Sequence, residues 1–166
     1  EGVSLYSAFA VLYSFQLRNL LKGIGQQMKW SVRDESLHSK MGCRLFRDMC
    51  KEDNQLLNLC RKDIIAAAEV MVDLEVKYIK KMFEMGDIEG IKANDLIHFI
   101  KKRANEKLVE LGYTDLGSYF AYDKLAASNL DWFYHLTGGV THTDFFAIRP
   151  TDYSKANEGE DFEDIW

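Results

Sequence analysis

Apolar residues recur at three- and four-residue spacing along most of the first 111 positions, which is the pattern of amphipathic helices. Gly86 and Gly112 stand at the expected C-terminal ends of two of these helices, the third and the fourth along the chain. From Tyr113 to His135 the pattern supports only short helical pieces, and the stretch GGVTHTDFF breaks it. The helices predicted from the pattern run from Glu1 to about Phe15, from about Leu21 to Cys50, from Asp53 to about Met85, and from Ala93 to Leu111.

Composition supports one all-α domain with a tail. The chain has 166 residues, of which 47% are apolar, with one proline and 11 glycines, so few positions oblige a helix to break. Residues 1–140 form the predicted helical unit. Residues 141–166 carry five acids among the last nine positions and no apolar period, which is typical of a flexible, solvated tail.

Charge and hydropathy exclude several classes of partner. The net charge of −5 has both signs interspersed, which argues against nucleic acid or an anionic membrane surface as a partner. The sequence contains no apolar run of membrane-spanning length and no signal peptide pattern at its start, so a cytosolic location fits. Cys43, Cys50 and Cys60 form no CxxC pair and are interpreted as free thiols without a function.

The first residues show helical periodicity at once, with no methionine and no polar lead. Because natural N-termini usually fray through polar residues, this start is expected of a fragment, a processed product or one half of a split protein.

The segment RDESLH, residues 33–38, places Glu35 and His38 three apart on one face of the second helix, where they could share a metal ion. Apolar neighbours on the same helix predict that this stretch is largely buried: Trp30, Val32, Met41 and Leu45. A buried carboxylate needs a cation, a proton or hydrogen-bond donors. An ExxH pair alone is weak evidence, since an exposed or salt-bridged pair has the same spacing.

Glu1 strengthens the metal hypothesis. It lies 34 residues before Glu35, and two antiparallel helices bring the two carboxylates level only if the chain reverses between about Gln16 and Leu21. Ferritin-like di-iron and di-manganese proteins use a Glu from each of two helices and a Glu-x-x-His from each of the other two. Glu1, Glu35 and His38 are half of that set. Asp95 and His98 have the same spacing in the fourth helix, but no second carboxylate is placed to match.

The combination of EGVSLYSAF, RDESLH and the later FFAIRPTDYSKA resembles the C-terminal half of the small, radical-generating subunit of class I ribonucleotide reductase. The resemblance implies a ferritin-like bundle in which Glu1, Glu35 and His38 bind the di-metal centre. It implies that Asp34 hydrogen-bonds a metal-ligating histidine of the N-terminal half and helps carry the radical outward, although a salt bridge with Arg33 is the alternative. Leu5 and Phe9 would form the apolar wall around the radical site.

The tail carries the rest of the resemblance. Tyr153 resembles the tyrosine that relays the radical to the large subunit. Phe162, Ile165 and Trp166 are large apolar groups on an acidic tether and resemble the motif that docks on that subunit. Ala147 replaces a glutamate that many members carry after the FF pair, so any proton-handling role of that acid is in doubt unless Asp144 or Asp152 supplies it.

The resemblance also implies the cofactors and partners. The cofactor would be two iron ions, manganese, or a mixed pair, shared with the N-terminal half that this chain lacks. The partners would be that half as a separate polypeptide, the large subunit, and a second copy of the completed small subunit. The chain alone would be inactive and would expose an apolar stripe on its first two helices. The alternatives are a ferritin-like oxidase that works without a large subunit, and a non-catalytic helical interaction module.

Overall fold

The computed structural model describes residues 2–138, so Glu1 and residues 139–166 lie outside the described residues. The predicted all-α fold class is confirmed for this part of the chain, and it agrees with a ferritin-like helical bundle. No helix between residues 2 and 138 is both long and apolar enough to cross a membrane. The elements are α1 (Tyr6–Leu17), α2 (Lys22–Glu52), α3 (Leu56–Met82), α4 (Ala93–Leu111), the 3-10 turn η1 (Thr114–Leu116), α5 (Lys124–Ser128) and α6 (Asp131–Gly138).

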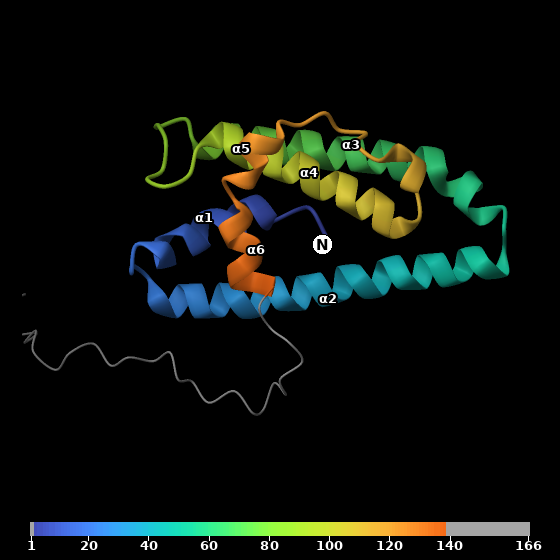
Figure 1. Cartoon of the computed structure of the whole chain (residues 1–166), viewed down its shortest axis with the longest axis horizontal. Helices are drawn as coiled ribbons and strands as arrows, with labels where there is room; N and C mark the ends of the chain where they lie inside the picture. Colours follow the sequence, from blue (N-terminus) through green and yellow to red (C-terminus); the bar gives the residue numbers. More distant parts are fainter. Residues whose placement is uncertain (1, 139–166) are drawn as a thin grey trace, which may run out of the picture.

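The helices pack as two hairpins joined by the last short helices (Figure 1). The first hairpin pairs α1 with α2, and the second pairs α3 with α4. α5 packs on α4, and α6 then crosses from that side of the molecule to reach α2. The described residues before α1 lie between α2 and the α3–α4 pair (Figure 1).

The chain reverses between α1 and α2 at Arg18–Leu21, so the predicted turn is confirmed. Asn19 and Leu21 adopt left-handed conformations, with φ of 64° and 50°, which end one helix and begin the next within four residues. Gly25 packs so closely on Gln16 of α1 that a Cβ at this position would overlap its side chain.

The predicted start of the first helix was wrong. α1 begins at Tyr6, and residues 2–5 are not helical, because Leu5 has φ of 72°. The apolar spacing continues through this segment, so periodicity alone did not show the break. α1 also has no side-chain cap from its own N-cap residue.

The other long helices agree with prediction more closely. α3 is shorter at both ends than Asp53–Met85, because Asp53 Oδ1 accepts the Gln55 N–H at 2.9 Å in the preceding turn and the chain leaves the helix at Phe83. α4 has the predicted bounds. Gly112 closes it with φ of 112°, and Gly86 has φ of 115° in the turn after α3.

The core lies where α1, α4 and α6 meet. Phe133 of α6 is fully buried, and its ring makes edge-to-face contacts with Tyr6, Tyr13 and Phe99. The three cysteines are free thiols, as predicted, with Cys43 buried and the other two half-buried.

The predicted burial of α2 around Glu35 is wrong for three of its four apolar neighbours. Val32 is buried, but Trp30, Met41 and Leu45 are exposed. The physical reason is that α2 has two apolar faces, and the described part of the chain covers only the one that carries Val32 and Cys43. The other face, which we name the α2 ridge, is made of Trp30, Leu37, Met41, Leu45 and Met49.

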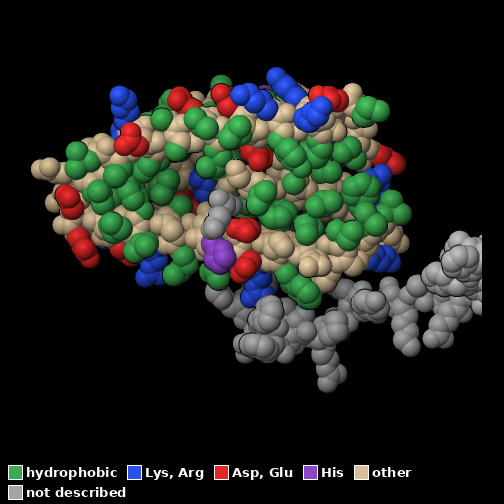
Figure 2. Space-filling view, turned by 180° about the vertical axis from the view of Figure 1, so that it is seen from behind, with side chains coloured by type: hydrophobic (Ala, Val, Ile, Leu, Met, Phe, Trp, Pro, Cys, Tyr) green, Lys and Arg blue, Asp and Glu red, His purple; other side chains and the backbone are tan. Residues whose placement is uncertain are grey.

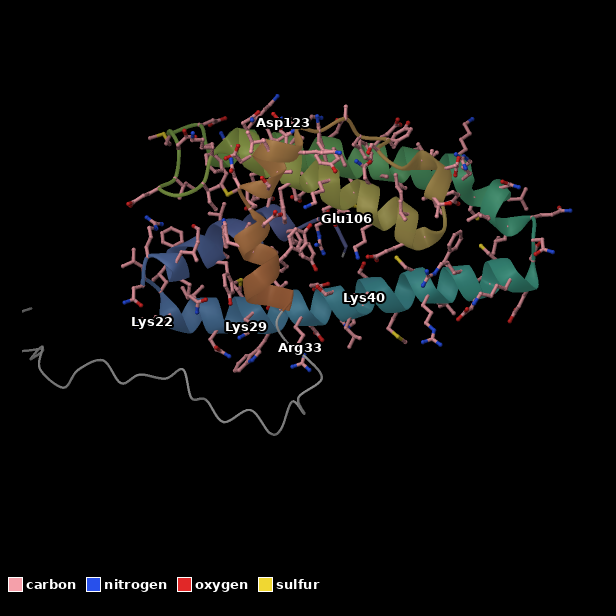
Figure 3. The ribbon with its side chains drawn as sticks, in the orientation of Figure 1. Lys22, Lys29, Arg33, Lys40, Glu106 and Asp123 are labelled. Atoms are coloured by element: carbon pink, nitrogen blue, oxygen red, sulfur yellow. The ribbon has the colours of Figure 1, made fainter. Side chains whose placement is uncertain are left out.

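The α2 ridge agrees with the expectation that the first two helices expose an apolar stripe. Four of its residues recur every fourth position, which places them in one row along the helix. Hydrophobic side chains gather over wide areas of the molecular face in Figure 2. A row of basic side chains also follows α2: Lys22, Lys29, Arg33 and Lys40 (Figure 3).

An exposed ion pair joins α3 to η1. Both terminal nitrogens of the Arg61 guanidinium donate to the Asp115 carboxylate, one of them at 3.1 Å. The hydrogen bond from Arg61 lowers the pKa of Asp115 below its ordinary value. A carboxylate with a depressed folded-state pKa stabilises the fold above its unfolded pKa of about 3.9, and this contribution is lost as pH falls through the folded-state pKa.

We expect Asp115→Asn to reduce stability slightly at pH 7, and the difference from the unsubstituted chain to shrink toward zero between about pH 4 and pH 2. Urea unfolding followed by circular dichroism at several pH values measures this. A difference that stays constant down to pH 2 would show that the charge of Asp115 is not the stabilising feature.

Candidate metal centre

Glu35 has an incomplete set of partners in the described structure. Its side chain is half-buried on α2, and its Oε2 atom is buried without a hydrogen-bond partner among residues 2–138. A buried carboxylate oxygen without a donor is costly, because desolvation is not offset. The oxygen is therefore suited to a cation.

His38 and Asp34 lie on the exposed side of the same helix. The His38 Nε2 atom is 3.9 Å from Asp34 Oδ1, one helical turn away. Both side chains are more than half exposed. The ExxH spacing thus places Glu35 and His38 on adjoining parts of α2, at the border between its buried face and the α2 ridge.

The segment that follows Glu1 packs directly against this part of α2. Gly2 lies between α2 and α4, where an added Cβ would be 2.5 Å from Ser39 Oγ and 2.9 Å from Lys107 Cδ. The Tyr6 hydroxyl is 2.8 Å from Ser36 Oγ. Ser36 and Ser39 are the residues that follow Glu35 and His38, so the N-terminal segment is held beside both candidate ligands.

The donor set fits a transition metal in its chemistry but is incomplete within residues 2–138. Carboxylate and imidazole groups suit iron or manganese, and the unpartnered oxygen of Glu35 provides a place for a cation. No group of three or more His, Cys, Asp or Glu side chains between residues 2 and 134 is placed to hold a metal ion. Glu1 lies outside the described residues, and a complete centre needs further ligands.

Leu5 and Phe9 differ in their surroundings. Phe9 is buried in the core and makes an edge contact with Tyr6 at 5.6 Å between ring centroids. Leu5 is 53% exposed at the N-cap of α1. The described residues therefore bury Phe9 and leave Leu5 on the surface.

His98 has a structural partner in α4. Its Nδ1 atom accepts a hydrogen bond from the Asp123 N–H at 3.0 Å, which holds the loop before α5. Asp95 accepts instead from the Asn129 side chain at 2.9 Å. The two residues face different partners, although their spacing is that of a ligand pair.

Sequence reasoning missed two buried charged residues that hold the N-terminal segment. Glu75 of α3 accepts the Leu5 N–H at 3.2 Å with Oε1 and the Ser7 hydroxyl with Oε2. Arg103 of α4 donates from Nε to the Gly2 carbonyl at 2.7 Å. These contacts span 68 residues or more, so no local pattern could have predicted them.

Comparison with known protein families decides the identity of this helical chain. The family model described as "Ribonucleotide reductase, small chain" matches residues 1–117. The chain belongs to this family. The predicted resemblance is thereby confirmed at the level of the ribonucleotide reductase small chain.

Three relatives illustrate the similarity. The chain is 31% identical to a probable ribonucleoside-diphosphate reductase small subunit of Invertebrate iridescent virus 3, over 95% of this chain and 41% of the relative. It is 26% identical to the ribonucleoside-diphosphate reductase subunit beta of Chlamydia pneumoniae, over 94% of this chain and 43% of the relative. It is 28% identical to the ribonucleoside-diphosphate reductase small chain of Encephalitozoon cuniculi, over 96% of this chain and 44% of the relative.

The chain thus spans less than half the length of these three ribonucleotide reductase relatives. The predicted tail residues Tyr153, Phe162, Ile165 and Trp166 lie outside the described residues, as does Ala147. Their proposed roles remain predictions.

Proposed function

We propose that this chain is the C-terminal half of a ribonucleoside-diphosphate reductase small subunit and supplies half of its di-metal centre. Glu1, Glu35 and His38 would hold the metals. The observation that carries the proposal is the Oε2 atom of Glu35, which is buried and has no hydrogen-bond partner among the described side chains. Two iron ions, two manganese ions or a mixed pair would fit these ligands. When bound, the metals supply the oxidising chemistry that generates a radical.

The residues of the chain have distinct proposed tasks around that centre. Asp34 would orient a metal-ligating histidine and help carry the radical outward, and Phe9 would help exclude water. Tyr153 would pass the radical to the large subunit, and Phe162, Ile165 and Trp166 would dock on it. The assembled complex with the large subunit would reduce ribonucleotides to deoxyribonucleotides. Its proposed location is the cytoplasm.

The α2 ridge supports a partner that completes the bundle. Trp30, Leu37 and Met41 stand exposed beside Glu35 and His38, and apolar rows of this kind are usually covered by another helix. The partner we propose is the N-terminal half of the family's small subunit, carried by a second polypeptide and bringing the missing ligands. Two such pairs would then form the dimer.

Metal analysis tests this proposal. The chain is purified by an affinity tag from its source, so that any complementary polypeptide accompanies it, and bound metals are quantified by mass spectrometry. We expect about two iron or manganese ions per complex, and at least a tenfold lower content in Glu35→Ala.

Glu52→Ala is the control, because Glu52 is exposed at the end of α2 and distant from the ExxH pair. Its metal content should equal that of the unsubstituted complex. A complex without transition metal, or full metal retention in Glu35→Ala, would contradict the proposed function.

A further inference from the structure

Arg103 is a buried cation whose contacts converge on the segment next to Glu1. Its side chain is 6% exposed in the middle of α4. Nε donates to the Gly2 carbonyl at 2.7 Å, and the guanidinium carbon lies 3.3 Å from the centre of the Tyr6 ring. Arginine is almost never buried unless paired, so this position calls for a reason.

The contacts of Arg103 reach α2 through Tyr6. Tyr6 is fully buried beneath the guanidinium, and its hydroxyl is 2.8 Å from Ser36 Oγ, next to Glu35. The guanidinium therefore contacts Gly2, the residue after Glu1, directly. It is connected to Ser36, the residue after Glu35, through the side chain of Tyr6. A planar guanidinium can donate to a carbonyl and stack on a ring at once, which a lysine ammonium cannot do.

Gly2 provides an independent reason why this segment has one position. A side chain there would overlap Ser39 of α2 and Lys107 of α4, so the backbone passes between the two helices at close range. Ser39 follows His38 in the sequence. Arg103 thus fixes the Gly2 carbonyl at a point where the chain touches the turn of α2 that carries the ExxH pair.

The surroundings on the far side of Arg103 are a phenol and a carboxylate. The Tyr134 hydroxyl donates to Glu106 at 3.3 Å, and Glu106 extends from α4 toward α6 (Figure 3). Burial and then Glu106 raise the pKa of Tyr134 well above its ordinary value, so the phenol stays neutral. The two contacts of Arg103 that carry the argument are thus to neutral groups, the Gly2 carbonyl and the Tyr6 ring.

We propose that Arg103 is a positioning residue for the metal centre, which holds the segment from Gly2 to Tyr6 against the turn of α2 that carries Glu35 and His38, through the Gly2 carbonyl and the Tyr6 ring. This inference rests on the proposed function, because it takes Glu35 and His38 to be metal ligands. It adds a residue of α4, outside the two ligand-bearing segments, to the support of the centre.

The test compares Arg103→Gln with Arg103→Lys in the tagged complex purified from its source. Gln keeps a donor for the Gly2 carbonyl but removes the charge and the stacked plane, and Lys keeps the charge. Mn²⁺ titration followed by electron paramagnetic resonance gives the affinity, and thermal unfolding of the metal-free complex reports the fold. We expect Arg103→Gln to bind Mn²⁺ at least 10-fold more weakly and Arg103→Lys to recover part of that loss.

Tyr6→Phe and Lys101→Gln make the test independent of folding defects. Tyr6→Phe keeps the ring under Arg103 and removes only the hydroxyl beside Ser36, so we expect about a threefold weaker affinity at a nearly unchanged unfolding temperature. Lys101→Gln, two residues before Arg103 on α4, should bind Mn²⁺ as the unsubstituted complex does.

The outcomes separate the inference from the proposed function. If the unsubstituted complex binds Mn²⁺ and Glu35→Ala does not, while Arg103→Gln and Tyr6→Phe bind normally, the role of Arg103 is overturned and the proposed function stands. If Arg103→Gln fails to fold, normal binding by both Tyr6→Phe and Arg103→Lys overturns the role of Arg103. If the unsubstituted complex binds no Mn²⁺ at all, the proposed function fails and this inference fails with it.

Discussion

Replacing Phe133 with alanine should lower the free energy of unfolding by about 4 kcal/mol, because it empties the centre of the core. The Phe133 side chain is fully buried, and its ring centroid lies 5.7 Å from that of Phe99 and 6.2 Å from those of Tyr6 and Tyr13. These neighbours belong to α1 and α4, so the single ring of α6 joins three helices. Few substitutions in the described chain remove as many buried aromatic contacts.

Urea unfolding monitored by circular dichroism measures this loss. Phe133→Leu keeps most of the volume and should cost about 1.5 kcal/mol, which separates the cavity from the aromatic contacts. Leu125→Ala in α5 is the control, since Leu125 is exposed, and it should change stability by no more than about 0.5 kcal/mol. A loss below about 1 kcal/mol for Phe133→Ala would mean that α6 does not stabilise the bundle.

Replacing Glu75 with alanine should cost about 3 kcal/mol and should loosen the start of α1 first. The Glu75 side chain is buried, and it accepts hydrogen bonds from the Leu5 N–H and the Ser7 hydroxyl. α1 has no side-chain cap of its own, so the carboxylate of α3 acts as its cap from 70 residues away. Hydrogen bonds to a charged group and the favourable charge at a helix N-terminus account for the magnitude.

Hydrogen exchange of the backbone amides gives the specific measurement. Glu75→Ala should increase exchange in the first turn of α1 more than in α4, and Glu75→Gln should lose only about 1 kcal/mol because the amide oxygen still accepts. Asp73→Asn is the matched control, since Asp73 is exposed two residues earlier on α3. If Glu75→Ala behaves like Asp73→Asn, then α1 does not depend on this carboxylate.

Local patterns in the sequence predicted the long helices well. The bounds of α4 and the left-handed Gly112 follow from apolar spacing and turn chemistry close to the residues concerned. The turn at Arg18–Leu21 was predicted instead from the requirement that Glu1 and Glu35 lie level on antiparallel helices. The start of α1 did not follow, because the break at Leu5 is stabilised by Glu75 from another helix. Contacts of that sequence separation leave no periodic signal.

In the candidate site, too, local spacing predicted some features and distant contacts determine the others. The ExxH spacing on α2 identified Glu35 and His38, and the structure adds that Glu35 has a buried oxygen without a partner in the described part of the chain. The expected burial of Trp30, Met41 and Leu45 failed, because an apolar pattern shows that a face is suited to packing and not what covers it. Arg103 gave no signal at all, since the carbonyl to which it donates belongs to Gly2, about a hundred residues earlier.

Native mass spectrometry of the complex purified from its source tests the central claim most directly, because it weighs the polypeptides and the bound metal together. The account predicts this chain with a second chain of similar size and about two iron or manganese ions per pair. A chain that is recovered alone and metal-free, even after iron or manganese and candidate N-terminal halves are supplied, would show that Glu1, Glu35 and His38 are not ligands of a working metal centre.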